Sequence, residues 1–380
     1  MVFYFLRLGA LGFGGPVALA NHMRRDLAEK RGWLTEAEYD RGLAIAAACP
    51  GPLAYQLGVY CGYVRLGIIG GVAVAIAFAL PPFLIVLAAA WVYSRFSGSW
   101  QLRALFYGVG PVVVALIVKA CWNLGRKTLA KDARAWALFA IACAVTVAVK
   151  KELTVIFLAA GALGIWLFPG RSPGQPDAGQ ARRILAPPLI LAIVPAATGM
   201  TAKLFVFFFR TGLLVFGSGL VIVPFLKTYV VDQYHWLGNR QFLDSVAIGM
   251  ISPGPVVISA TFVGYLLDGL RGAVAASAGI FAPAVLFTIL ATPLFVRYAA
   301  NPYLQGFVRG ITAAVVGVLV GTTYLVAETA IGDALTIFVA IGSLLAFTLW
   351  KRLPEPVIVA AGALIGLVAY PLLRPGWVLK

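Results

Sequence analysis

Long runs of apolar residues, separated by short clusters of charged and polar residues, make up most of the chain. Runs such as 66–94, 272–296 and 310–327 approach or exceed the ~20 residues with which an α-helix crosses a bilayer. They lack the strict alternation of apolar and polar residues that a membrane β-strand requires. The pattern therefore predicts an all-α polytopic membrane protein.

Charged clusters divide the first part of the chain into six apolar segments. They cover roughly residues 3–20, 42–64, 66–94, 104–118, 135–149 and 153–168. Residues 169–180 follow, with the proline, glycine and polar composition of a linker. An extra apolar segment at 184–201 comes next, and the six-segment pattern then begins again, which gives about 13 segments in all.

The second part of the chain repeats the first at an offset of 203 positions. Residues 5–16, FLRLGALGFGGP, recur as residues 208–219, FFRTGLLVFGSG, and the Pro-Gly-Pro motif at 50–52 recurs at 253–255. We therefore predict two homologous domains, 1–168 and 203–380. Residues 169–202 join them as a linker plus one extra transmembrane helix.

The orientation of the two halves depends on how many segments cross the membrane. If all 13 cross, six per half and one between them, the second half is inverted relative to the first. If the Pro-Gly-Pro segments are re-entrant instead, the halves are parallel. Basic residues divide almost evenly between the two sides in the first arrangement, so the positive-inside rule sets no orientation.

Composition agrees with a membrane protein, because 61% of residues are hydrophobic and 12% are charged. The net charge of +16 comes from basic residues in short loops between apolar runs, which indicates loops that face membrane lipid rather than nucleic acid. The four cysteines lie in or against apolar segments and are interpreted as buried thiols. No cleavage site follows the first apolar stretch, so we expect that stretch to remain in the mature protein.

Arg7 and Arg210 are the strongest candidates for a binding role. A guanidinium among phenylalanines and leucines must face protein, water or an anionic ligand. Their matching positions in the two halves place both near one pseudo-symmetric centre. The alternative is that each extends to the membrane interface or pairs with a buried carboxylate.

Glycine breaks follow both arginines, at Gly14-Gly15-Pro16 and at Gly217-Ser218-Gly219. A helix that begins within the membrane exposes backbone N–H groups and the positive end of its dipole. Beside an arginine, such a helix end is suited to a small anion. The alternative is that the glycines only allow close packing of helices.

The Pro-Gly-Pro motifs interrupt helices a second time in each half, and we interpret them as helix breaks or gating elements. Backbone groups freed there are tolerated only beside protein or a polar cavity. The six residues are Pro50, Gly51, Pro52, Pro253, Gly254 and Pro255. Small polar side chains just past each break are either donors to an oxyanion or hydrogen-bonding partners between helices: Gln56, Tyr60, Ser252, Ser259 and Thr261.

Opposite charges occupy two further pairs of matching positions. Arg41 corresponds to Asp244, and Arg65 corresponds to Asp268. The pairs indicate either ion pairs across the pseudo-two-fold axis or simple divergence at loop edges.

Catalytic and cofactor motifs are lacking in the sequence. No Gly-rich phosphate loop is present, and the two histidines, His22 and His235, lie in charged loops. No clustered carboxylates support a zinc centre or a two-metal site, and no arrangement of a nucleophile with a base stands out. We therefore expect neither an enzyme, nor a cofactor, nor a bound metal.

The stretch FLRLGALGFGGPVA, with RGWLTEAEYDRGLAIAAACPGPLAYQ after it, resembles the chromate ion transporter family, in the type with two such domains. The resemblance implies export of chromate across the cytoplasmic membrane of a bacterium or archaeon, with chromate resistance as the result. It also implies halves of opposite orientation, which favours 13 crossings. The family pattern points to Arg7, Gly14, Gly15, Pro16, Pro50, Gly51, Pro52, Gln56, Arg210, Gly217, Gly219, Pro253, Gly254 and Pro255.

The sequence therefore predicts a secondary transporter for a tetrahedral dianion, bound near the bilayer centre by arginine and helix-end amides. Chromate is the first candidate, and a permease for sulfate or another oxyanion is the alternative. Two different classes of protein, an anion channel and a membrane scaffold that binds no solute, also stay open. The coupling ion and the oligomeric state also stay open, and a homodimer is one of the possible states. Cys49 stands where the second half has Ser252, so the two half-sites differ.

Overall fold

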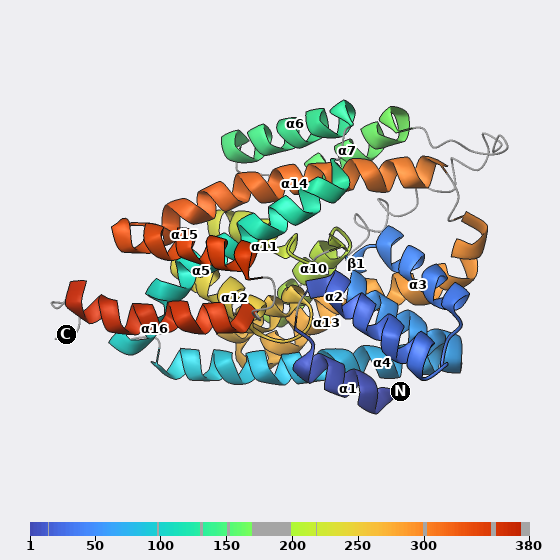
Figure 1. The fold of residues 1–380 in the computed structure, drawn as a ribbon, viewed down its shortest axis with the longest axis horizontal. Coiled ribbons are helices and arrows are strands. Elements are labelled where there is room, and N and C mark those ends of the chain that lie inside the picture. Colours follow the sequence, from blue (N-terminus) through green and yellow to red (C-terminus); the bar gives the residue numbers. More distant parts are fainter. Residues whose placement is uncertain are drawn as a thin grey trace.

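The structure is a computed structural model of the chain, and it describes residues 1–13, 15–96, 99–129, 132–149, 153–168, 199–217, 219–298, 302–350 and 355–373. Helices dominate it (Figure 1), which confirms the prediction of an all-α protein. The predicted linker and most of the extra segment at 184–201 lie outside the described residues.

The elements of the two halves follow one another in a similar order. The first half contains α1 (Val2–Leu11), α2 (Gly15–Met23), η1 (Arg24–Lys30), α3 (Glu36–Ala48), β1 (Gly51–Pro52), α4 (Leu53–Phe96), α5 (Trp100–Thr128), α6 (Ala133–Val149) and α7 (Leu153–Leu167). The second half contains α10 (Met200–Gly212), β2 (Phe216–Gly217), α11 (Ile222–Phe225), η2 (Leu226–Gln233), α12 (Asn239–Ile251), η3 (Val256–Ile258), α13 (Ser259–Tyr298), α14 (Pro302–Ala330), α15 (Ala334–Leu349) and α16 (Glu355–Leu373).

Membrane-spanning character is clearest in five stretches of the described residues. By length and composition these are 53–96, 100–126, 256–290, 305–330 and 355–372. Shorter apolar helices are α1, α6, α7 and α15. Both findings agree with the predicted polytopic membrane protein.

α4 consists of two antiparallel arms rather than one long helix. Leu66 and Gly67 leave the helical conformation, and Gly67 has a φ of +63°. The Tyr55 hydroxyl of the first arm donates to the carbonyl oxygen of Ala75 in the second arm at 3.2 Å. The charged residue at the predicted segment boundary, Arg65, therefore precedes a turn.

α13 folds back in the same way at Asp268 and Gly269, and the hydroxyls of Thr261 and Ser277 lie 2.7 Å apart across its arms. Leu66-Gly67 thus corresponds to Asp268-Gly269, and the predicted match of Arg65 with Asp268 is wrong by one residue. The tight helix η3 precedes α13, whereas no such turn precedes α4. A 3₁₀ helix rises about 2.0 Å per residue, against about 1.5 Å in an α-helix. The three residues of η3 therefore cover the length of four α-helical residues, which explains the difference of one residue.

The Pro-Gly-Pro segments fold back instead of crossing. A Cβ on Gly42 would lie 2.3 Å from the Tyr60 ring, so α3 and the first arm of α4 run side by side. Gly249 and Ser259 meet in the same way in the second half. The prediction that all 13 segments cross is therefore wrong, because two prolines without N–H groups and a glycine with φ of +140°, Gly51, reverse the chain.

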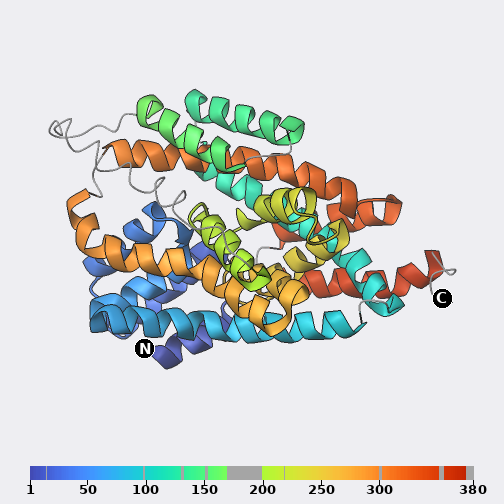
Figure 2. The ribbon, with the colours of Figure 1, turned by 180° about the vertical axis from the view of Figure 1, so that it is seen from behind.

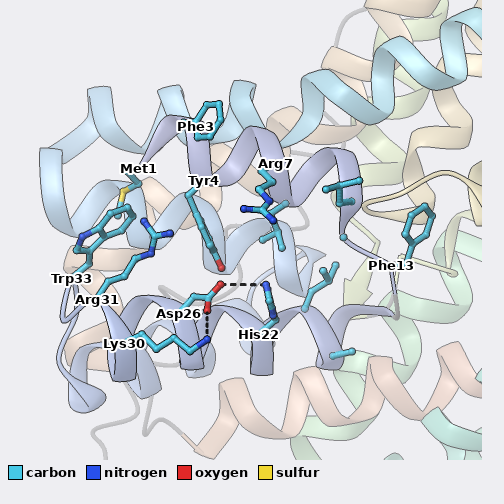
Figure 3. Close-up of a pocket in the computed structure, with 15 residues that line it drawn as sticks. Met1, Phe3, Tyr4, Arg7, Phe13, His22, Asp26, Lys30, Arg31 and Trp33 are labelled. Carbon is cyan, nitrogen blue, oxygen red and sulfur yellow. Dashed lines mark ion pairs between the residues drawn. The ribbon is translucent and has the colours of Figure 1, made fainter. Parts of the chain in front are cut away.

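The predicted segment 3–20 is also broken, into α1 and α2, which lie opposite each other and are joined past Phe13 (Figure 3). Each half therefore begins with short helices that turn back. The second arms of α4 and α13 run in opposite directions, and so do α5 and α14 (Figures 1 and 2).

The helices form two groups that do not coincide with the sequence halves. In the central group, α1 packs on α4, α4 on α13, and α13 on α10. In the outer group, α6 and α7 pack on α14, whereas α15 and α16 pack on α5. Hydrogen bonds across the halves tie the outer group together, among them those from Tyr107 Oη to Asp333 Oδ2 at 2.5 Å and from Arg309 Nη2 to Asp132 Oδ2 at 3.0 Å.

Candidate functional site

Each Pro-Gly-Pro turn is hydrogen-bonded to the residue two positions before the glycine break of the other half. The N–H of Gly51 donates to the carbonyl oxygen of Val215 at 2.5 Å, and the N–H of Gly254 donates to that of Gly12 at 3.1 Å. β1 and β2 extend the first contact as a short parallel pair. Donors and acceptors are each 203 positions apart, so the two bonds are related by the sequence repeat.

This reciprocal pairing is the feature that sequence reasoning missed. The repeat placed the breaks near one centre, but it did not say which break meets which turn. Gly12 and Val215 carry no side-chain signal for the contact, because both take part through their carbonyl oxygens. The constant offset between the motifs was the only indication in the sequence.

The glycines of the two turns are required by backbone conformation and by space. Gly51 and Gly254 have φ values of +140° and +89°. A Cβ on Gly51 would lie 2.7 Å from the Cβ of Ala284, and one on Gly254 would lie 3.2 Å from Pro82 Cγ. Each turn therefore packs against the long arm of the other half as well as its glycine break.

Helices begin directly after three of the four irregular segments. α2 starts at Gly15 with Pro16 as its second residue, and α4 starts after Pro52. η3 starts after Pro255 and leads into α13. Proline suits a helix start because its missing N–H has no intrahelical acceptor there. The remaining first-turn N–H groups carry the positive end of each helix dipole toward the joined turns.

Two buried polar atoms near these turns have no hydrogen-bond partner among the residues that the structure describes. Gln56 donates through Nε2 to the carbonyl oxygen of Pro50 at 2.7 Å, but its Oε1 has none. The hydroxyl of Ser259 also has none, and both side chains are 0% exposed. Each lies four residues past the last proline of its Pro-Gly-Pro motif. Unpartnered buried polar groups are rare, and they indicate that a water or a ligand completes the site.

Arg7 lies on a cavity of about 710 Å³ between α1 and the stretch formed by α2 and η1. Figure 3 shows its guanidinium extending from α1 toward the opposite helix, which carries His22, Asp26 and Lys30. Asp26 pairs with His22 at 3.2 Å and with Lys30 at 3.4 Å. With Arg31, which also lines it, the cavity therefore combines four basic side chains with one carboxylate.

Arg210 lies in the last turn of α10 and is exposed, as Arg7 is. The lining of the Arg7 cavity comes from residues 1–33 alone, so it does not include Arg210. The structure thus joins the turns and breaks of the two halves, but it does not join the two arginines in this cavity.

Other predicted residues fall close to the joined turns. Gly15 begins α2, Gly217 pairs with Pro52, and Gly219 has a φ of +67°. Gly14 and Ser218 lie outside the described residues.

A sequence model described as "Chromate transporter" matches residues 1–165 and 202–367. The chain belongs to the chromate transporter family. The two matched stretches coincide closely with the two halves of the repeat, so the duplication of this family member is seen in both its sequence and its element order.

Relatives with this family's name cover nearly the whole chain. The chromate transport protein of Cupriavidus metallidurans is 46% identical, over 98% of this chain and 94% of its own. A probable chromate transport protein of Synechococcus elongatus is 40% identical, over 96% and 94%. A chromate transport protein of Pseudomonas aeruginosa is 32% identical, over 97% and 91%. No solved structure matches the chain significantly.

Proposed function

We propose that this protein is a secondary transporter that exports chromate across the cytoplasmic membrane and so confers chromate resistance. The substrate follows from relatives named chromate transport proteins. The observation that carries the location of the site is the reciprocal bonding of turns and breaks, with the unpartnered atoms of Gln56 and Ser259 beside it.

The groups near the joined turns suit a tetrahedral dianion. The first-turn N–H groups of α2 and α4 and the Ser259 hydroxyl supply donors. Arg7, whose cavity also includes Gly12, and Arg210, five residues before Val215, supply two positive charges in this proposal. These charges neutralise a doubly negative ion and lower the cost of holding it in low dielectric. Gln56 Oε1 accepts from a water that accompanies the anion. Further amide donors in this proposal are Gly14, Gly15, Gly217, Ser218 and Gly219.

Inverted halves supply a route for alternating access. The opposite directions of α4 and α13 support this arrangement (Figures 1 and 2). An anion at the junction of two inverted units can be exposed to one side of the membrane and then to the other, as small movements of the units open opposite paths.

Arginine variants with matched controls test the site. In everted vesicles, we expect Arg210→Ala and Arg7→Ala to lower chromate uptake about tenfold or more, since a hydrogen bond to a charged group contributes roughly 1.5–3 kcal/mol. Arg271→Ala and Arg65→Ala remove exposed arginines near the hairpin turns of α13 and α4, and they should transport normally. Equal loss in all four variants, or loss in none, would remove the special role of the first pair.

Sulfate has the same charge and almost the same shape as chromate. Competition between the two anions in one uptake assay therefore decides the preference. A lower inhibition constant for sulfate than for chromate would make the protein a sulfate permease instead.

A further inference from the structure

Asp244 is a buried carboxylate that the proposed function does not use. It lies on α12, which is not among the candidate spans, and it is 3% exposed. The Tyr93 hydroxyl donates to its Oδ2 at 2.7 Å. Arg41, at the matching position of the first half, is exposed. The ion pair suggested for these two residues is therefore not formed, and no ion pair of the described residues includes Asp244.

Few groups act on this carboxylate. Tyr93 faces it from α4, and the ring of Tyr93 packs on Phe106 of α5 and Phe262 of α13. Arg240 lies one turn earlier on α12 and is exposed. Burial raises the pKa of Asp244 to about 7, and the hydrogen bond from Tyr93 and the charge of Arg240 only partly oppose this rise. The charged residues of η2, Lys227 and Asp232, pair with each other. Among the described residues, no charged group of η2, α5, α13, α14 or α16 adds to these effects.

We propose that Asp244 is the proton-binding site that couples oxyanion transport to a proton gradient. The identity of the transported anion in this inference rests on the proposed function, whereas the proton site does not. The proton adds to Oδ1, which leaves Oδ2 to accept from Tyr93. Because α12 and α4 belong to different halves, this hydrogen bond links protonation to the contact between them.

The position of Asp244 connects it to the candidate oxyanion site. α12 ends at Ile251, directly before the Pro-Gly-Pro turn, and Ile251 lies about 10 Å along the helix from Asp244. Gly249 on the same helix packs against Ser259, whose hydroxyl has no partner within the described ranges. An ionised carboxylate needs more donors than one phenol supplies, so loss of the proton favours an arrangement in which water reaches α12. Movement of α12 then displaces the turn that it leads into.

Infrared titration of the purified protein tests the proton site without any cargo. We expect a protonated-carboxyl band that disappears as the pH is raised through about 7. The band should be absent from Asp244→Asn and present in Asp268→Asn, a partly buried aspartate that accepts from Thr201 at the hairpin turn of α13. A wild-type spectrum without the band, or the same band in Asp244→Asn, would overturn the proposal.

Flux through proteoliposomes tests the coupling. Asp244→Asn should keep exchange of labelled for unlabelled chromate but lose accumulation driven by an imposed pH gradient, while Asp268→Asn keeps both. Retention of gradient-driven accumulation in folded Asp244→Asn, or loss of exchange as well, would contradict a coupling role. Failure of the wild type to move chromate would refute the proposed function, and the infrared result would still decide the proton site.

Tyr93→Phe provides a readout that a structural role would not change. Removing the hydroxyl takes away a donor that stabilises the ionised carboxylate, so the pKa of Asp244 rises. The midpoint of the pH profile of gradient-driven uptake should therefore shift to more alkaline pH. An unchanged midpoint would show that Tyr93 and Asp244 do not take part in the coupling of transport to the proton gradient.

Discussion

Individual side chains near the joined turns differ mainly in whether their polar atoms are satisfied. Ser252 and Ser259 both follow α12 and both are buried serines, so the sequence could not rank them. In the structure, the Ser252 hydroxyl donates to the carbonyl oxygen of Gly249 at 3.0 Å, whereas that of Ser259 has no partner in the described part of the chain. Hydrogen bonds between residues three positions apart depend on local geometry, which the sequence pattern does not specify.

Ser259→Ala should weaken chromate binding if its hydroxyl donates to the anion. A donor to a charged group contributes roughly 1.5–3 kcal/mol, so we expect the apparent KM for uptake to rise about tenfold or more. Ser245→Ala is the matched control, because Ser245 is equally buried and its hydroxyl already donates to the carbonyl oxygen of Phe242. Equal KM values for the two variants would exclude Ser259 from the site.

At the scale of elements, hydropathy located the apolar segments but not the reversals within them. The predicted segments 135–149 and 153–168 match α6 and α7 closely. The segment 42–64 is a hairpin, because the chain reverses at Gly51 and brings Gly42 against Tyr60. A run of apolar residues has the same hydropathy whether it crosses a bilayer or turns back, so only the glycine and proline positions marked the difference.

Gly51→Ala tests the turn on which both the hairpin of residues 42–64 and the hydrogen bond to Val215 depend. The residue has a φ of +140°, and its Cβ would meet Ala284 and Gln56 at 2.7 and 2.8 Å. We expect lower thermal stability and loss of uptake, because the turn must shift away from Val215. Gly32→Ala shares a positive φ, +58°, but has no atom within 4 Å of its Cβ. The Gly32→Ala variant should lose only about 1–2 kcal/mol of stability and keep its uptake. Normal uptake by Gly51→Ala would contradict the account.

At the scale of the whole molecule, the packing groups are not the two sequence halves. Each half contributes its broken segments to the central group and its last helices to the outer group, where they pack on the other half. The repeat predicted two similar units, but it could not predict this exchange, because α6 and α7 are apolar on most faces and would fit several partners.

Counterflow of chromate in proteoliposomes tests the central claim most directly, namely that the protein moves its cargo by alternating access to one internal oxyanion site. Vesicles loaded with unlabelled chromate should transiently accumulate labelled chromate above equilibrium, and the initial rate should saturate with concentration. Labelled chromate that only equilibrates, with a flux proportional to concentration and no overshoot, would contradict the account and indicate a channel.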